Sequence, residues 1–61
     1  MTWSELEKKV KKAGNKFHRH GKKHDIWLNP KTGEKFEIAR HRTQEVPKGT
    51  LDSIKTKARL D

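Results

Sequence analysis

The residues best suited to acid–base chemistry lie together in the segment Arg19–Trp27. In it, His24 directly follows Lys22 and Lys23, and Gly21 precedes the two lysines. A histidine has an unperturbed pKa of about 6.5 and so takes and gives protons near neutral pH. Fixed cations stabilise the negative charge that develops on a phosphoryl group during reaction. The segment therefore predicts a site that binds a phosphodiester and moves a proton on it, with His24 as its central residue.

Other residues near this segment have more than one interpretation. His18, His20 and His24 form a His-x-His-x-x-x-His pattern, but the chain has no cysteine and no well-placed carboxylate, so we predict no metal site and no cofactor. We expect His18 and His20 to line an open sheet face beside Trp27, where they contact RNA or a partner protein, or to be exposed spacers. Trp27 either stacks on an RNA base or, more ordinarily, covers the sheet or packs into a partner.

The cations elsewhere predict a nucleic-acid surface less specifically. The chain has 61 residues and a formal net charge of +8, which favours binding to polyanions with a strong dependence on salt. We assign RNA binding to Lys22, Lys23, Arg19, Trp27 and Lys55. The lysines of the first helix are better explained as a solvated face.

The composition limits the architecture to a single domain over residues 1–61. Only 28% of the residues are hydrophobic and 39% are charged, which is compatible with disorder, but the apolar residues recur at regular spacings that favour a folded chain. The absence of cysteine, of a signal peptide and of any apolar run long enough to cross a membrane predicts a cytoplasmic protein with no membrane partner.

Helices are predicted at both ends of the chain. The first spans residues 2–13, where Thr2 and Glu5 form a capping box and Gly14 ends the helix. Its apolar stripe consists of Trp3, Leu6, Val10 and Ala13. The second helix begins at Thr50, and its stripe consists of Leu51, Ile54 and Ala58. Each helix must bury its stripe against another element.

Three strands are predicted between the helices, at 16–20, 24–29 and 34–39, with turns at 21–23 and 29–33 and a polar loop at 40–47. Along the second strand, Ile26 and Leu28 fall on one face, whereas Asp25 and Trp27 fall on the other. His24 shares the face of Ile26 and Leu28, so a histidine at the edge of the core is the alternative to a catalytic one.

In the third strand, Phe36 and Ile38 are predicted to face inward, between Lys35 and Glu37. The order of elements is α-β-β-β-α. We predict an α+β fold in which both helices cover one face of a three-stranded antiparallel sheet.

This order of elements, together with a set of short motifs, resembles the HicA toxin family. The motifs are Ala13-Gly14, Arg19, His24-Asp25-Ile26-Trp27, Arg40-His41 and Lys48-Gly49-Thr50-Leu51-Asp52-Ser53-Ile54. The resemblance runs from the first helix to Leu60. It implies a fold similar to double-stranded-RNA-binding domains, an mRNA interferase activity, and a cognate HicB antitoxin that holds the toxin in check.

The resemblance also implies that His24 is catalytic, because the family places its catalytic histidine at the start of the second strand. Relatives usually have Gly-Ser before this histidine, where the present chain has Lys22 and Lys23. Many relatives also have proline where this chain has Ala39. His41 matches a family position and would assist His24 only if its loop folds back.

From these observations we predict a metal-independent endoribonuclease that cleaves mRNA. His24 would be its general acid/base, Lys22 and Lys23 its phosphate partners, and a HicB-like antitoxin its inhibitor. The main alternative is a small basic RNA-binding module without catalysis. A DNA-binding domain is disfavoured, because three strands between the helices do not fit a helix-turn-helix. A lysine-rich ribosomal protein fits the charge but not the placed histidine.

Overall fold

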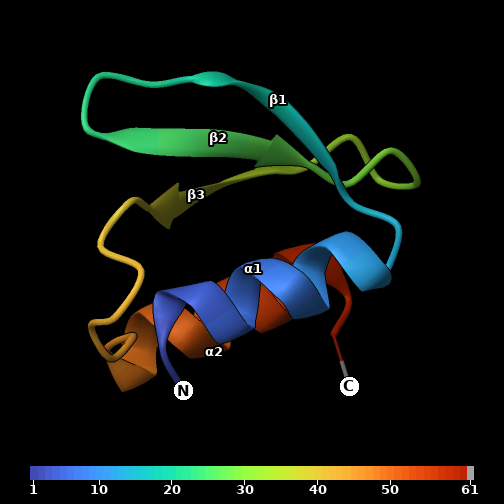
Figure 1. The fold of residues 1–61 in the computed structure, drawn as a ribbon. Helices are drawn as coiled ribbons and strands as arrows, with labels where there is room; N and C mark the ends of the chain where they lie inside the picture. Colours follow the sequence, from blue (N-terminus) through green and yellow to red (C-terminus); the bar gives the residue numbers. More distant parts are fainter. Residues whose placement is uncertain (61) are drawn as a thin grey trace.

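The structure is a computed structural model that describes residues 1–60, and it has the predicted order of elements (Figure 1). The elements are α1 (Trp3–Lys12), β1 (Lys16–His20), β2 (His24–Leu28), β3 (Lys35–Ala39) and α2 (Lys48–Ala58). The strands form an antiparallel sheet in the order β1-β2-β3, and both helices lie on the same side of it. The predicted α+β class and α-β-β-β-α order are confirmed. β2 ends, and β3 begins, one residue inside the predicted bounds.

Helix α1 begins at its predicted cap. The Thr2 hydroxyl accepts a hydrogen bond from the backbone N–H of Glu5 (3.3 Å), and the Glu5 carboxylate accepts one from the backbone N–H of Thr2 (2.9 Å). Leu6 and Val10 are completely buried. Ala13 was predicted to share their stripe, but it is the C-cap and is exposed, because the helix ends one residue before it.

The loop between β3 and α2 packs against the start of α1. The backbone N–H groups of Trp3 and Ser4 donate to the carbonyl oxygens of Gln44 and Arg42, both at 3.0 Å. The loop thereby satisfies donors that the first turn of a helix otherwise leaves without partners. Val46 is buried in the core, which the prediction of a polar loop missed.

Helix α2 begins at Lys48, two residues before the predicted start. Pro47 is its N-cap, with φ of −57°, and no side chain caps this end. Gly49 lies within the first turn and does not delay the helix. The predicted stripe is confirmed: Ile54 and Ala58 are buried, and Leu51 packs against the core at its edge.

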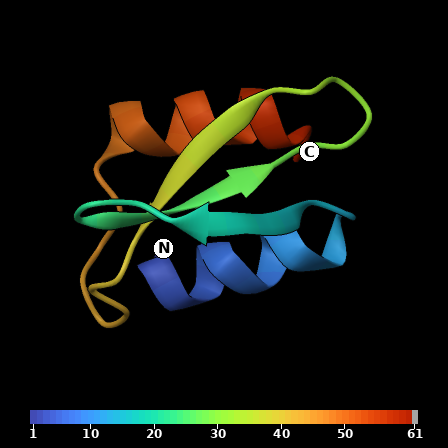
Figure 2. The ribbon, with the colours of Figure 1, turned by 90° about the horizontal axis from the view of Figure 1, so that it is seen from above.

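The register between β2 and β3 decides which face of the sheet the helices cover. Trp27 lies opposite Phe36, and Asp25 lies opposite Ile38. Phe36 and Ile38 are core residues, so their partners also face the helices. Figure 2 shows the sheet from above, with α1 along one side of it and α2 along the other. Trp27 is only 5% exposed. The prediction that it lies on the open face, available to stack on a base, is wrong, because the helices cover its face of the sheet.

A bulge in β1 changes which of its side chains share a face. Phe17 lies opposite Trp27, but Arg19, two residues later, lies opposite Ile26, one residue away from Trp27. His18 is therefore the extra residue, as in a β-bulge. The bulge brings Arg19 to the open face beside Ile26.

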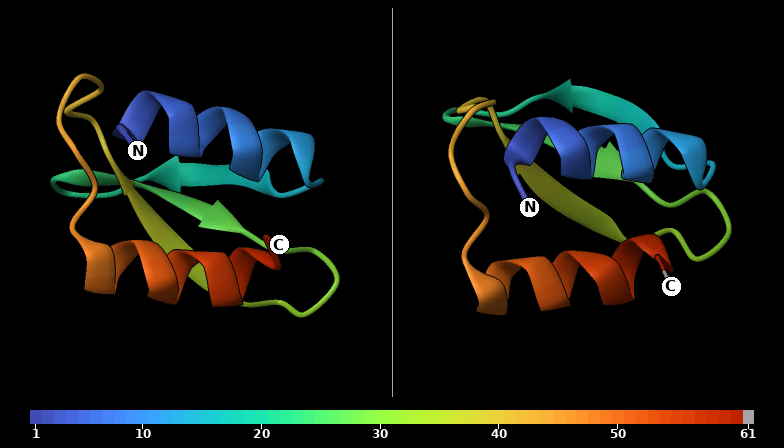
Figure 3. Two further views of the ribbon diagram at one scale, coloured as in Figure 1. Left: turned by 90° about the horizontal axis from the view of Figure 1, so that it is seen from below. Right: turned by 60° about the horizontal axis from the view of Figure 1, so that its bottom comes forward.

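Two buried asparagines bind the end of α2, in the region where α1 and α2 both end (Figure 3). The side-chain amide of Asn15 donates to the carbonyl oxygens of Val10 (3.0 Å) and Ala58 (3.1 Å). The amide of Asn29 donates to the carbonyl oxygen of Lys57 (3.0 Å). These bonds use carbonyl groups near the helix ends and fix α2 against the turn after β2.

Neither helix in residues 1–60 has the length and apolar character that a membrane crossing requires.

Candidate functional site

His24 lies at the start of β2 on the face of the sheet opposite the helices. It borders a surface hollow of about 320 Å³, which we call the histidine hollow. The hollow is lined by Gly21, Lys22, Lys23, His24, Ile26 and Glu37. The His24 side chain is 39% exposed, so the imidazole is reachable from solvent. A histidine at the edge of the core was the alternative, but the core lies on the other face of the sheet.

Glu37 is the carboxylate nearest to His24 in this hollow. Its Oε2 lies 3.4 Å from Nδ1 of His24. Glu37 pairs with Ile26, so it is the diagonal neighbour of His24 on the same face of the β2–β3 ladder. A carboxylate beside one ring nitrogen orients an imidazole and favours the tautomer with its proton on that nitrogen. The other nitrogen, Nε2, is then left for proton transfer.

Glu37 was not among the site residues predicted from the sequence. Alternation in β3 placed Glu37 on the face away from Phe36 and Ile38, but alternation in β2 did not decide which face carries His24. What was missing was the register, which decides whether the two side chains are neighbours.

The turn before His24 depends on a close approach at Gly21. The Gly21 N–H donates to the carbonyl oxygen of His24 (2.8 Å). A Cβ on Gly21 would lie 2.5 Å from that same oxygen, so any side chain would force the backbone to shift. Lys22 and Lys23 occupy the exposed part of the turn, and both line the histidine hollow. Gly21 thus permits a tight turn, and the turn carries two cations.

Asp25 faces away from His24 and anchors a separate network. Its Oδ1 accepts hydrogen bonds from Nδ1 of His20 (2.8 Å) and Nε of Arg40 (2.9 Å). Nη2 of Arg40 also donates to the carbonyl oxygen of Gly21 (3.0 Å). Arg40 therefore ties the end of β3 to the turn that precedes His24. This agrees with the prediction that Asp25 and His24 lie on opposite faces of the second strand.

The Asp25 carboxyl is held in its charged form. Partial burial acts to raise the pKa of Asp25, but the hydrogen bonds from Arg40 and His20, with the charges of both groups, outweigh that effect. The pKa of Asp25 is therefore lowered from its ordinary value. The network keeps its ionic character down to low pH.

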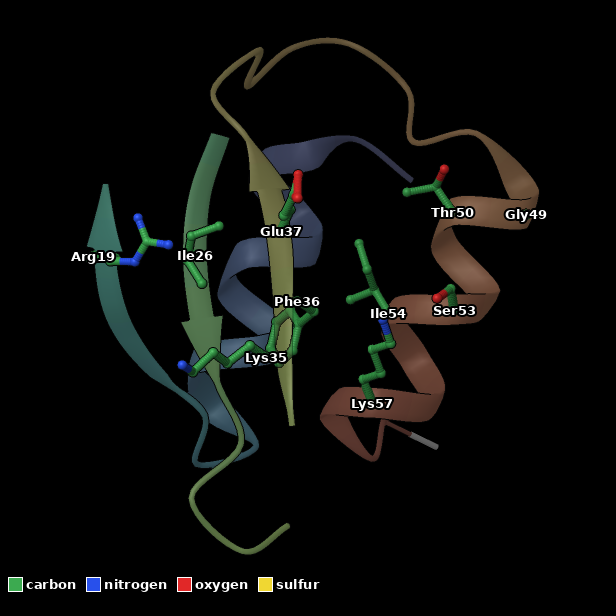
Figure 4. A pocket seen from close by; sticks show the side chains of 10 residues that line it. All are labelled: Arg19, Ile26, Lys35, Phe36, Glu37, Gly49, Thr50, Ser53, Ile54 and Lys57. Carbon is green, nitrogen blue, oxygen red and sulfur yellow. The ribbon is translucent and has the colours of Figure 1, made fainter. Parts of the chain in front are cut away.

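A second, larger hollow runs beside the first, between the sheet and α2 (Figure 4). This α2 groove has a volume of about 570 Å³. It is lined by Arg19, Ile26, Lys35, Phe36, Glu37, Gly49, Thr50, Ser53, Ile54 and Lys57. Ile26 and Glu37 line both hollows, so the α2 groove is continuous with the histidine hollow.

The structure brings most of the predicted RNA-binding residues to these two hollows. Lys22 and Lys23 line the histidine hollow, and Arg19 lines the α2 groove. Lys55 is not among the residues lining the α2 groove; Lys57, two residues later on α2, lines it instead. Trp27, as noted, is in the core.

The other histidines do not join His24. His20 is bound to Asp25 and lies edge-on to Phe17, with ring centroids 4.9 Å apart. Among the hydrogen bonds and ion pairs within residues 1–60, none links His41 to His24. In the same residues no three histidine or carboxylate side chains are grouped so that they would hold a metal ion.

A comparison with protein families gives one match. The family described as "HicA toxin of bacterial toxin-antitoxin" matches residues 3–60, which span both helices and the whole sheet. Comparisons with curated proteins and with solved structures gave no match. The matched range includes His24, Glu37 and both hollows, and we conclude that the chain belongs to the HicA toxin family of bacterial toxin–antitoxin systems.

Proposed function

We propose that this toxin is an endoribonuclease that cleaves mRNA, with His24 as its general acid/base. The observation that carries the proposal is the placement of His24. It lies on the open face of the sheet, half-exposed, with Nδ1 turned to Glu37 and two lysines on the preceding turn. An accessible imidazole with one nitrogen oriented by a carboxylate is suited to proton transfer.

The proposed reaction is an internal transesterification of RNA. Nε2 of His24 accepts the proton of a ribose 2′-hydroxyl, and the 2′-oxygen then forms a bond to the adjacent phosphorus. The bond between phosphorus and the 5′-oxygen breaks, and this oxygen takes a proton from solvent or from the imidazolium. The products are a 2′,3′-cyclic phosphate and a 5′-hydroxyl, and the protein needs no cofactor for any of these steps.

Lys22 and Lys23 are assigned to the phosphate. Both are exposed, and among residues 1–60 neither is in an ion pair with a carboxylate. Cations held near the phosphorus stabilise the extra negative charge of the transition state. With a single histidine and lysines on a turn, we expect a slow enzyme.

A toxin of this family has an antitoxin partner, and we propose that the partner is a HicB-like protein with an acidic surface. The +8 charge of the toxin favours rapid capture by such a surface. Capture that covers the histidine hollow would exclude RNA.

Induced expression in a bacterial host tests the proposed function. Wild-type toxin should arrest growth and deplete full-length messages, and His24→Ala should do neither. His18→Ala is the matched control, because His18 is an exposed histidine on the bulge of β1 and does not line the histidine hollow. It should behave as wild type. If His24→Ala arrests growth as strongly as wild type, catalysis by His24 is wrong, and an RNA-binding module without catalysis becomes the better account.

A further inference from the structure

We infer that the α2 groove is the binding site for the single-stranded RNA that flanks the cleaved phosphodiester, with one unstacked nucleotide seated in it. This inference rests on the proposed cleavage of RNA at His24. It gives a role to Gly49 and Thr50, which helped to mark the family resemblance but lie outside the histidine hollow.

The charges of the groove fit a polyanion. Arg19, Lys35 and Lys57 line it, against a single carboxylate, that of Glu37. Within the described residues, none of these three cations is in an ion pair. They come from three elements, β1, β3 and α2: Arg19 and Lys35 lie over the sheet, and Lys57 lies on α2 (Figure 4). Cations spread along a groove in this way follow a nucleic-acid backbone.

The floor and the α2 wall of the groove fit a nucleotide rather than a bare phosphate. Ile26 provides partly exposed apolar surface at its base, and the buried side chains of Phe36 and Ile54 lie beneath it. The side chains of Thr50 and Ser53 lie on the side of α2 that faces the sheet, with the Ser53 hydroxyl and the Thr50 methyl group turned toward it (Figure 4). In the described part of the chain, neither hydroxyl donates or accepts a side-chain hydrogen bond. They are therefore available to a ribose or a base edge.

The volume and the apolar floor favour single-stranded RNA. The groove, about 570 Å³, is within the size range of pockets that hold small ligands. In a duplex the base faces are stacked and cannot reach such a floor, whereas an unpaired base can be splayed out into it. A nucleotide seated there leads directly to His24, because Glu37 and Ile26 border both hollows.

The test measures binding of labelled single-stranded RNA in the His24→Ala background, so that the RNA stays intact. Lys35→Gln with Lys57→Gln removes two groove cations. Lys9→Gln with Lys12→Gln removes two cations from α1, where both lysines are exposed and lie outside the groove. We expect the double substitution in the groove to weaken RNA binding about tenfold or more. The slope of log K against the logarithm of the salt concentration should become shallower by about 1.4, because two phosphate contacts are lost. The double substitution in α1 should change the RNA affinity and its salt dependence much less.

A second pair of variants tests the shape of the groove independently of its charge. Ser53→Leu fills the α2 wall without changing the net charge, and Thr56→Leu makes the same change at an exposed α2 position outside the groove. Ser53→Leu should weaken RNA binding and Thr56→Leu should not. Circular dichroism and thermal unfolding verify that each variant is folded.

The outcomes distinguish this inference from the proposed function. Weaker RNA binding in the groove variants, even if wild type cuts no RNA, supports the groove and rejects only the cleavage. Cleavage by wild type that needs His24, with groove variants binding RNA as well as their controls, overturns the groove and leaves the cleavage intact. Groove variants that bind RNA normally but lose the antitoxin also overturn it, because the groove is then a protein-docking site.

Discussion

Glu37, and not the adjacent Asp25, is the carboxylate that faces His24. Glu37 Oε2 lies 3.4 Å from Nδ1 of His24, although the two residues are on different strands. Asp25 points to the helix side of the sheet and binds Arg40 and His20 there. The two carboxylates therefore have separate surroundings: one lies beside the histidine, and the other fastens the turn that carries it.

Glu37→Gln should slow RNA cleavage while leaving the protein folded. The amide cannot supply the negative charge that favours one imidazole tautomer, so we expect the rate constant for cleavage to fall about tenfold, less than the 10²–10⁴-fold typical of losing a general acid/base. Single-turnover cleavage with saturating protein measures this step apart from RNA binding.

Glu34→Gln is the charge-matched control for that substitution. Glu34 precedes β3 and lies outside both hollows. Glu34→Gln removes one negative charge, as Glu37→Gln does, so any general gain in RNA affinity will appear in both variants. Equal cleavage rates for Glu37→Gln and Glu34→Gln would show that the contact with His24 has no catalytic role.

Arg40→Gln should destabilise the protein by about 1 kcal/mol. It removes the charged bonds to Asp25 and to the carbonyl oxygen of Gly21. Such bonds contribute about 1.5–3 kcal/mol when shielded, and the 44% exposure of the Arg40 side chain reduces that figure. Arg42→Gln, which breaks a more exposed ion pair with Glu7, should cost less than about 0.5 kcal/mol. Urea unfolding of wild type and the two variants provides the comparison. Equal stabilities for the two variants would show that the contacts of Arg40 with Asp25 and Gly21 do not stabilise the fold.

The elements and their order could be predicted from the sequence because their signals are local. The capping box of Thr2 and Glu5 and the stripe through Leu6 and Val10 predicted α1 correctly. The side of the sheet that the helices cover was harder to predict from the sequence. β2 has apolar residues on both faces, so alternation alone did not choose between Trp27 and Ile26.

The pH dependence of stability should carry the signature of Asp25. Its pKa is lowered in the folded protein from about 3.9 in the unfolded chain. Between these two values the unfolded chain binds more protons, so the free energy of unfolding rises with pH in that window and is level above it. Stability is therefore lost as the pH falls below about 4 and through the folded pKa.

Asp25→Asn isolates this contribution. The difference in unfolding free energy between wild type and Asp25→Asn should shrink as the pH falls below about 4. The pKa of Glu5 is also lowered, through its hydrogen bonds with Thr2, but this effect is present in both proteins and cancels in the difference. A difference that does not change between neutral and acid pH would contradict the ionic network.

Gly21→Ala should displace the turn before His24. The added Cβ would meet the carbonyl oxygen of His24 at 2.5 Å, which the backbone relieves only by moving. We expect a loss of about 1–3 kcal/mol in stability together with slower cleavage. Gly49→Ala is the matched control for stability alone, since a Cβ there meets nothing within 4 Å and alanine favours the helix by about 1 kcal/mol. If Gly21→Ala is as stable and active as wild type, the close approach is not required.

The chemistry of the site was visible in the sequence, but its geometry was not. His24, Lys22 and Lys23 were found from their types and their adjacency. Glu37 and the α2 groove depend on the strand register and on the helix packing, which join residues far apart in the chain. The bulge at His18 likewise determines on which face of the sheet Arg19 lies, and the local sequence does not predict this bulge.

Cleavage of a defined single-stranded RNA by purified protein in the presence of a chelator tests directly whether His24 activates the 2′-hydroxyl. We expect products with 2′,3′-cyclic phosphate and 5′-hydroxyl ends from wild type and from His18→Ala, and no products from His24→Ala. Products of equal amount from wild type and His24→Ala, or ends with a 5′-phosphate, would contradict a reaction in which His24 activates the 2′-hydroxyl.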